Sequence, residues 1–274
     1  SQGNPQEAYN LASESNEIAT ELNLPINKAR ALSIMGDIKL TQGDFVTAEK
    51  HLLSSLRIFE ELNYDLGIEY ILSPLGLVME SQGKLKASLA YANQRKEISE
   101  KLGDPISIAG THLHLANLLI KMGDLAQAEI HAIKMWDIVV QLDEPQALLA
   151  AYYIAAEIAY AQSNYQLSLD KYTLALNISQ ESGIKENEVD LLCSIGKVAI
   201  DANQYELAEQ NIHECFNVAN ETNNTLFLAT SKLYLAQLFL SQNQRDKVIH
   251  PLNLALDFLE NNNNEILYHI CLTF

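Results

Sequence analysis

The sequence predicts an all-α chain that forms a solenoid, a right-handed superhelix of antiparallel helix pairs. Small or turn-favouring residues recur at an unbroken spacing of forty: Gly3, Gly43, Gly83, Gly123, Ser163, Asn203 and Asn243. A second column of small residues, seven positions earlier, keeps the same register: Gly36, Gly76, Ala116, Ala156, Gly196 and Ala236. No β-branched, alternating run competes with the helical spacing of the apolar residues. A fixed period without insertions indicates one helical unit stacked on copies of itself.

Residues 29–62 show how each unit is built. Apolar residues from Ala29 to Ile38 recur at helical spacing, Gln42-Gly43-Asp44 interrupts them, and Phe45 to Phe59 resume the pattern. The unit is therefore a helix, a tight turn and a second helix. Similar signals recur along the chain: Asp44, Asp124 and Asn164 stand where they can cap a second helix, and Pro105 and Pro145 stand in the first turn of a leading helix.

The period divides the chain into repeats of one domain, 1–274. Residues 4–22 match only the second helix of a unit, and residues 264–274 begin a further first helix, so both ends are expected to lie within a unit. The complete pairs are expected at about 26–62, 65–102, 105–142, 145–182, 185–222 and 225–262. Pro74 and Pro251 fall inside predicted helices and are expected to kink them, and a kink near Pro74 could also shape a binding pocket.

Composition excludes several classes of partner. A formal charge of −17 disfavours direct binding to nucleic acid or to an anionic bilayer. No apolar run is long enough to span a membrane, and the first residues lack the pattern of a secretory signal. We expect a cytoplasmic protein, with the periplasm as the alternative if a leader was removed.

No enzymatic chemistry, cofactor or metal is expected. Phosphate-binding glycine loops and nucleophile motifs are absent from the sequence, and no histidine pair has the spacing of helical metal ligands. The three cysteines are odd in number and widely spaced, and Cys193 and Cys215 lie in apolar helical contexts. We therefore expect buried free thiols.

The turn motif resembles that of the tetratricopeptide repeat (TPR) family, in which glycine, aspartate and an aromatic residue precede a small residue. Gly43, Asp44, Phe45 and Ala48 match this pattern, and Gly36, Gly196, Tyr205 and Ala208 fall on other signature columns. The period is longer than the family's usual thirty-four residues, which longer helices explain. This variety is similar to the arrays of bacterial signalling regulators, including sensor halves of signal-transduction ATPases, pheromone-peptide receptors and repeat-linked diguanylate cyclases. The resemblance implies partner binding rather than catalysis.

The resemblance also implies where a partner would bind, because in this family the first helix of each pair lines the concave surface. The matching residues of the central repeats are Leu77, Leu113, Asn117, Ile120, Lys121, Tyr153, Glu157, Tyr160, Lys197 and Ile200. Packing against a neighbouring helix is the alternative role for each of them. A carboxylate clamp of the kind found in some relatives is excluded, because Leu113 and Ile154 stand where its lysine and its second asparagine should be.

The leading hypothesis is a non-catalytic scaffold or sensor segment of a larger signalling regulator, which binds a protein or peptide in its concave groove. The alternative is a small-ligand receptor that controls an effector domain missing from this chain. Self-association is a third hypothesis, because the terminal helices carry apolar residues with a neighbour on one side only. These residues are Ala8, Leu11, Ala12, Ile266, Leu267, Ile270 and Phe274.

Overall fold

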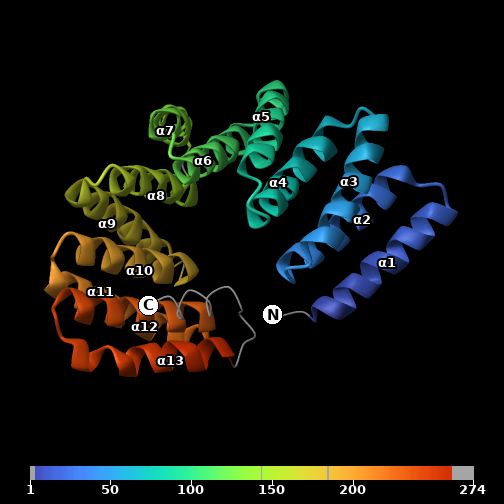
Figure 1. The fold of residues 1–274 in the computed structure, drawn as a ribbon. Helices are drawn as coiled ribbons and strands as arrows, with labels where there is room; N and C mark the ends of the chain where they lie inside the picture. The colour runs from blue at the N-terminus through green and yellow to red at the C-terminus, as the bar shows by residue number, and fades with distance from the viewer. Residues whose placement is uncertain (1–3, 143, 184, 261–274) are drawn as a thin grey trace. The chain divides into compact units, whose positions relative to one another are not determined.

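A computed structural model describes residues 4–142, 144–183 and 185–260, which form α-helices, one 3₁₀ turn and no strand (Figure 1). The helices are α1 (Pro5–Glu21), α2 (Pro25–Thr41), α3 (Phe45–Glu61), α4 (Asp65–Ser81), α5 (Leu85–Leu102), α6 (Pro105–Met122), α7 (Leu125–Val139), α8 (Pro145–Ala161), α9 (Tyr165–Ser182), α10 (Lys185–Asp201), α11 (Tyr205–Glu221), α12 (Thr225–Ser241), η1 (Arg245–Lys247) and α13 (Ile249–Glu260). The prediction of an all-α solenoid is confirmed, while its right-handed course and the repeat boundaries stay predictions.

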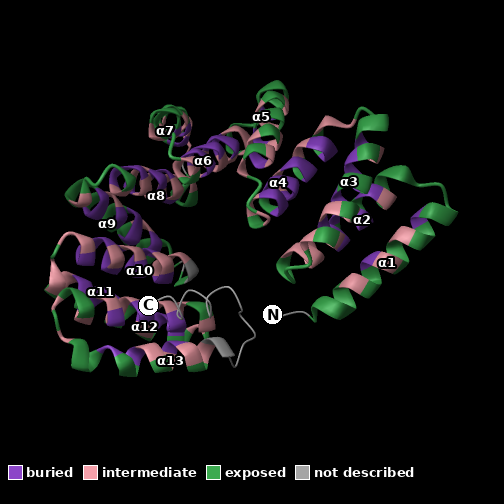
Figure 2. Cartoon of the chain, in the orientation of Figure 1, coloured by how far each residue is buried: buried purple, intermediate pink, exposed green. Residues whose placement is uncertain are grey.

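The helices fall into two units, 1–138 and 139–274, and each is described by itself. In the first unit, consecutive helices from α1 to α6 pack against one another, and α2 also contacts α4. In the second unit, consecutive helices from α8 to α13 pack in the same way, and α10 also contacts α12. The first helices of successive pairs therefore lie side by side in both units. Figure 2 shows the buried residues along the helix faces that meet their neighbours.

Left-handed backbone at the turns explains the forty-residue column. Gly43, Gly83 and Gly123 have φ of 76, 72 and 80°, and Ser163, Asn203 and Asn243 have φ of 58 to 59°. Glycine adopts this conformation without steric cost and asparagine tolerates it, which accounts for the residue types in the column. A second set of left-handed residues ends the second helices at the same spacing: Asn23, Asn63, Gly103, Gly183 and Asn223.

The column of small residues marks close helix approach. A Cβ added at Gly36 would lie 2.6 Å from the side chain of Leu52, and one added at Gly196 would lie 2.7 Å from that of Ile212. Leu52 and Ile212 are fully buried and belong to the two main apolar clusters of the described chain, one in each unit. Small residues at these positions therefore let the two helices of a pair pack tightly.

The expected helix signals are present with one exception. Asp44, Asp124 and Asn164 accept backbone N–H bonds from the residue three positions on. Pro74 lies buried inside α4 as expected. The prediction for Pro251 is wrong, because α13 begins only at Ile249, after the η1 turn, which places Pro251 in the first helical turn. Proline is tolerated there because its missing N–H has no intrahelical partner.

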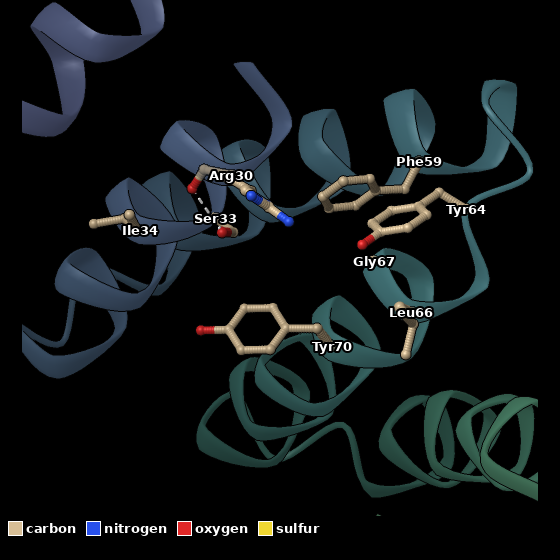
Figure 3. Close-up of a pocket in the computed structure, with 8 residues that line it drawn as sticks. All are labelled: Arg30, Ser33, Ile34, Phe59, Tyr64, Leu66, Gly67 and Tyr70. Atoms are coloured by element: carbon tan, nitrogen blue, oxygen red, sulfur yellow. Dashed lines mark hydrogen bonds between the residues drawn. The ribbon is translucent and has the colours of Figure 1, made fainter. Parts of the chain in front are cut away.

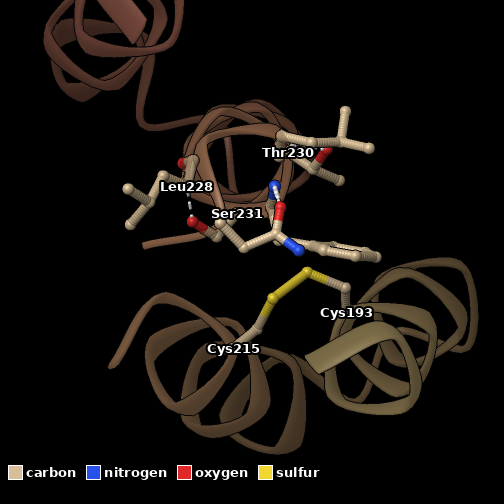
Figure 4. The surroundings of a disulfide bond; sticks show 8 residues. Cys193, Cys215, Leu228, Thr230 and Ser231 are labelled. Carbon is tan, nitrogen blue, oxygen red and sulfur yellow. Dashed lines mark hydrogen bonds between the residues drawn. A yellow bond between two sulfur atoms is a disulfide. The ribbon is translucent and has the colours of Figure 1, made fainter. Parts of the chain in front are cut away.

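The prediction of free thiols is wrong for two of the three cysteines. Cys193 of α10 and Cys215 of α11 form a disulfide, with the Cα atoms 5.5 Å apart and both residues buried (Figure 4). α10 and α11 are the two helices of one pair, so residues at similar distances from the turn face each other despite their separation of 22 residues. Leu228, Thr230 and Ser231 of α12 lie around the disulfide. Cys271 lies outside the described residues.

Candidate functional site

In the first unit, the candidate residues lie on α4 and α6. Leu77 is 45% exposed on α4. Leu113, Asn117 and Ile120 of α6 are each half-buried, which leaves part of each side chain open to a partner. Lys121 is exposed at the end of the same helix.

The charge of Lys121 is already compensated. Its Nζ lies 2.7 Å from Glu80 Oε2, and His114 Nε2 lies 2.7 Å from Glu80 Oε1. Burial alone would raise the pKa of Glu80, but the hydrogen bonds and charges of His114 and Lys121 outweigh it and lower the pKa to about 2. This ion cluster ties α6 to α4 and leaves little net charge for a partner.

In the second unit, aromatic and acidic groups come together on α8 and α10. Tyr172 of α9 donates a hydrogen bond to Glu157 of α8, and the rings of Tyr153 and Tyr172 meet edge-on with centroids 5.5 Å apart. The side chain of Tyr153 also forms a hydrogen bond with Asp190 of α10. Two helix pairs are thus joined by half-buried polar groups rather than by aliphatic packing alone.

A second polar contact lies two turns further along these helices. The Tyr160 hydroxyl donates to Asp201 Oδ2 at 2.7 Å, and Lys197 Nζ lies 4.4 Å from the centroid of the Tyr160 ring. This cation–π contact holds Lys197 over the aromatic face. Tyr160 and Lys197 are both half-buried, so a partner could still contact them.

Burial and nearby carboxylates raise the pKa values of four tyrosines in the second unit above the ordinary value of about 10. Burial, followed by the charges of Asp190 and Glu157, raises the pKa of Tyr153 and brings that of Tyr234 to about 12. Burial raises the pKa of Tyr172 and Tyr160 as well, with Glu157 and Asp201 as the carboxylates beside them. The hydroxyl groups therefore act as hydrogen-bond donors to the carboxylates.

One predicted contact residue has a different role, and four residues of the polar cluster were not predicted. Ile200 is 3% exposed and packs in the core of the second unit, so it offers no surface. Asp190, Asp201, Tyr172 and Tyr234 join the polar cluster. Asp190 could have been found in the sequence, because it lies on the same first helix as the predicted contact residue Lys197, two turns earlier.

The structure also contains an apolar pocket of 330 Å³ in the first unit, between α2, the end of α3 and the start of α4 (Figure 3). Phe59, Tyr64, Leu66 and Tyr70 line it, and Arg30 of α2 lies at its edge. A neighbouring hollow of 430 Å³ shares Tyr70 and includes Leu77. The binding surface predicted from the sequence lies further along the chain and does not include this pocket.

A histidine pair connects α6 to α7. His112 Nδ1 lies 2.8 Å from His131 Nδ1, and only a pair with one donor and one acceptor nitrogen satisfies this contact. Burial, followed by nearby positive groups, lowers the pKa of both rings to about 4. Both histidines are therefore neutral near pH 7.

Two further properties concern the described residues alone. No helix in these ranges is both long enough and apolar enough to cross a bilayer. Nor do three or more potential metal-binding side chains gather at any point of the described chain.

Helix pairs of this length, with left-handed turns, small residues at the crossing points and first helices side by side, define a TPR-type array. The chain belongs to the MalT-like TPR region family, whose pattern matches residues 1–253. No protein with a curated description matches the sequence.

Solved structures show the same fold at low sequence identity. Aspartyl phosphate phosphatase F from Bacillus subtilis is 16% identical with a TM-score of 0.74, over 93% of this chain and 65% of that one. The Rap conjugation gene regulator of plasmid pLS20, in complex with the Phr* peptide, is 13% identical with a TM-score of 0.69, over 87% and 65%. BtubC (BKLC) from P. vanneervenii is 19% identical with a TM-score of 0.67, over 81% and 94%.

Proposed function

We propose that the chain is a non-catalytic binding segment of a larger signalling regulator, and that it takes a peptide or protein partner along its first helices. The observation that carries the proposal is the polar cluster of the second unit, where Tyr153 and Tyr160 of α8 lie beside Asp190 and Asp201 of α10 and Glu157 of α8 accepts a hydrogen bond from Tyr172. A helix pair needs no such groups for packing. The Phr* peptide complex of a regulator with this fold supports the same class of partner.

The chemistry of the cluster favours a partner with basic groups. The cluster contains three carboxylates, those of Glu157, Asp190 and Asp201. Lys197 is the positively charged side chain of the cluster. Burial, followed by the charge of Glu157, raises the pKa of Asp190, which shows that negative charge is costly there. A cationic side chain of a partner would relieve this cost.

Selection of peptides from a displayed random library on the immobilised chain tests this proposal. Enriched peptides should carry lysine or arginine, and hydrogen exchange with a selected peptide should protect α8, α10 and α12 more than α9 and α11. Failure to enrich any peptide, or protection confined to the second helices, would contradict the proposal.

We propose the cytoplasm as the compartment, and the disulfide provides the test. Cytosolic thiols are normally kept reduced, whereas disulfides persist in oxidising compartments. If the chain works in the cytoplasm, rapid alkylation in intact cells, followed by mass spectrometry, should find the pair that forms the disulfide in the structure reduced, with Cys193 and Cys215 modified as thiols. A fully oxidised pair would place the chain in the periplasm or outside the cell.

Self-association is the remaining proposed contact. Leu11 of α1 is 61% exposed, while Ala12 beside it is buried against α2. The predicted contribution of Ile266, Leu267, Ile270 and Phe274 lies outside the described residues. Light scattering should show dimers that Leu11→Glu abolishes, and a concentration-independent monomer would rule the contact out.

A further inference from the structure

The pocket between α2, α3 and α4 has a floor that is fixed by packing. Phe59 is 2% exposed, and a Cβ added at Gly67 would lie 2.5 Å from its ring. The ring therefore lies directly against the backbone of α4. This contact gives the pocket a rigid aromatic floor that exists before any ligand binds.

Exposed apolar side chains gather around this floor. Ile34, Leu66 and Tyr70 are 48, 56 and 53% exposed. Single exposed apolar residues are ordinary, but a group of them around one concavity indicates a binding surface. The volume of 330 Å³ lies at the lower end of the range for ligand pockets, which suits a compact ligand.

Arg30 supplies a positive charge at the edge of this apolar space. The ion pairs formed by the described residues do not include Arg30, although the chain carries a net charge of −17. Figure 3 shows the Arg30 guanidinium and the Tyr64 hydroxyl pointing toward the same space in front of Phe59. A guanidinium in this position can form two parallel hydrogen bonds with a carboxylate.

Beyond Tyr70, the carboxylate of Asp37 in the neighbouring hollow disfavours anions. The Tyr70 hydroxyl donates to Asp37 Oδ2 at 3.1 Å, so one rim group is bound to a carboxylate. Asp37 follows Arg30 by two helical turns on α2, which corresponds to about 10 Å along the axis. A ligand with one negative end would therefore bind in a single orientation, with that end at Arg30.

We propose that this pocket binds a compact apolar carboxylic acid, with its carboxylate on Arg30 and its apolar body, aromatic for preference, against Phe59 and Tyr70. Two kinds of ligand carry an apolar group beside a carboxylate: a free small acid and the carboxyl-terminal residue of a peptide. This site is separate from the peptide-binding strip proposed above, which is the polar cluster on the first helices of the second unit. Its residues belong to α2, α3 and α4 of the first unit.

Ligand-observed NMR on the whole chain, with N-acetyl-L-phenylalanine and its uncharged carboxamide as probes, tests the charge requirement. The acid should bind saturably, and the amide should bind about tenfold more weakly, because it loses a charge-assisted hydrogen bond. Equal affinity for the two probes, or no saturable binding of the acid up to about 10 mM, would overturn the proposal.

Matched variants locate the site. Arg30→Met should bring the affinity for the acid down to that for the amide, while Arg57→Met, an exposed arginine on α3, should leave both unchanged. Tyr70→Ala should lower the affinity for both probes. If circular dichroism shows that the alanine variant is unfolded, Tyr70→Leu is used in its place. If the Arg30→Met variant still bound the acid more tightly than the amide, the carboxylate would bind elsewhere and the assignment would be refuted.

Two further probes separate the sources of the ligand. The tripeptide Ala-Ala-Phe should bind more tightly than N-acetyl-L-phenylalanine if a peptide terminus is the natural occupant. Phenylacetate should bind more tightly than either if the occupant is a free small acid. Selected basic peptides that bind the second unit should be unaffected by Arg30→Met, so failure of this site and failure of the peptide-binding strip are distinguishable.

Discussion

The first helices of the two units carry the same repeat positions but different chemistry. In the first unit, Glu80, His114 and Lys121 neutralise one another. In the second unit, Glu157 and Asp190 are held by tyrosine hydroxyls, which donate hydrogen bonds without cancelling charge. The comparison shows that equivalent repeat positions lie on equivalent helices, whereas the residue at each position decides whether a carboxylate is paired with a cation or with a hydroxyl group.

This difference predicts opposite pH sensitivities, and we expect the largest effect here because several groups act together. His112 and His131 have pKa values lowered to about 4, and Glu80 to about 2, so the first unit loses stability as the pH falls below about 6.5 and again below about 4.5. Tyrosines in both units have raised pKa values, but the shifts are largest in the second unit, so that unit should lose the most stability as the pH rises above about 10.

Hydrogen exchange read separately over the two units checks this prediction. Peptides from α4–α7 should lose protection first in acid, and those from α8–α12 first in alkali. His112→Gln with His131→Gln should reduce the acid sensitivity between about pH 4 and 6.5. Equal loss of protection in both units at both extremes would remove the electrostatic distinction between them.

Removal of one hydroxyl group should destabilise the second unit strongly. Tyr172→Phe leaves the Glu157 carboxylate without a donor in a half-buried position, which should lower the free energy of unfolding by about 1–3 kcal/mol. Tyr91→Phe in the first unit is the matched control, with an expected change within about 0.5 kcal/mol. Urea unfolding of both variants measures the difference, and similar values would show that the Tyr172 bond adds nothing.

The ion cluster of the first unit should contribute less. Glu80→Gln removes the charge that faces His114 and Lys121, but Lys121 is solvent-exposed, so we expect a loss of about 1 kcal/mol. High salt should lower the free energy of unfolding of the wild type toward that of the variant. A loss that is insensitive to salt would indicate packing rather than charge.

A substitution in the turn at Ser163 has the smallest expected effect on stability. Ser163 is a non-glycine residue at φ 59°, whereas Gly43 and Gly123 occupy the same column in the first unit. Ser163→Gly should therefore raise the free energy of unfolding by up to about 1 kcal/mol, because it removes the steric cost of left-handed backbone. A loss of stability would show that the serine side chain contributes a contact that outweighs this cost.

The fold could be predicted from the sequence because turns and helix crossings each restrict residue type. Left-handed turns select glycine and asparagine, and close approach at Gly36 and Gly196 excludes larger side chains. A second turn column, with Asn63 and Gly103 among its members, was present in the sequence and would have fixed the ends of the second helices. Fixed spacing made these features visible without any knowledge of tertiary contacts.

The site could be predicted only in part, because helical position does not reveal what a side chain contacts. Tyr153, Glu157 and Tyr160 were placed on the correct helix, but their hydrogen bonds depend on α9 and α10. Free thiols were predicted for Cys193 and Cys215 from their spacing in the sequence. Disulfide formation depends instead on which residues of two antiparallel helices lie opposite each other. Arg30 was not predicted as a binding residue, because the role that we propose for it depends on Phe59 and Tyr70, which belong to other helices.

The affinity of a library-selected peptide for Tyr160→Ala, compared with Lys50→Ala, tests the central claim most directly. Tyr160 lies on the polar strip of the second unit, and Lys50 is an exposed residue of α3. If the strip binds the partner, Tyr160→Ala should raise the Kd about 30-fold or more, as expected for an aromatic hot spot, and Lys50→Ala should leave it unchanged. An unchanged Kd for a Tyr160→Ala chain that circular dichroism shows to be folded would contradict the account.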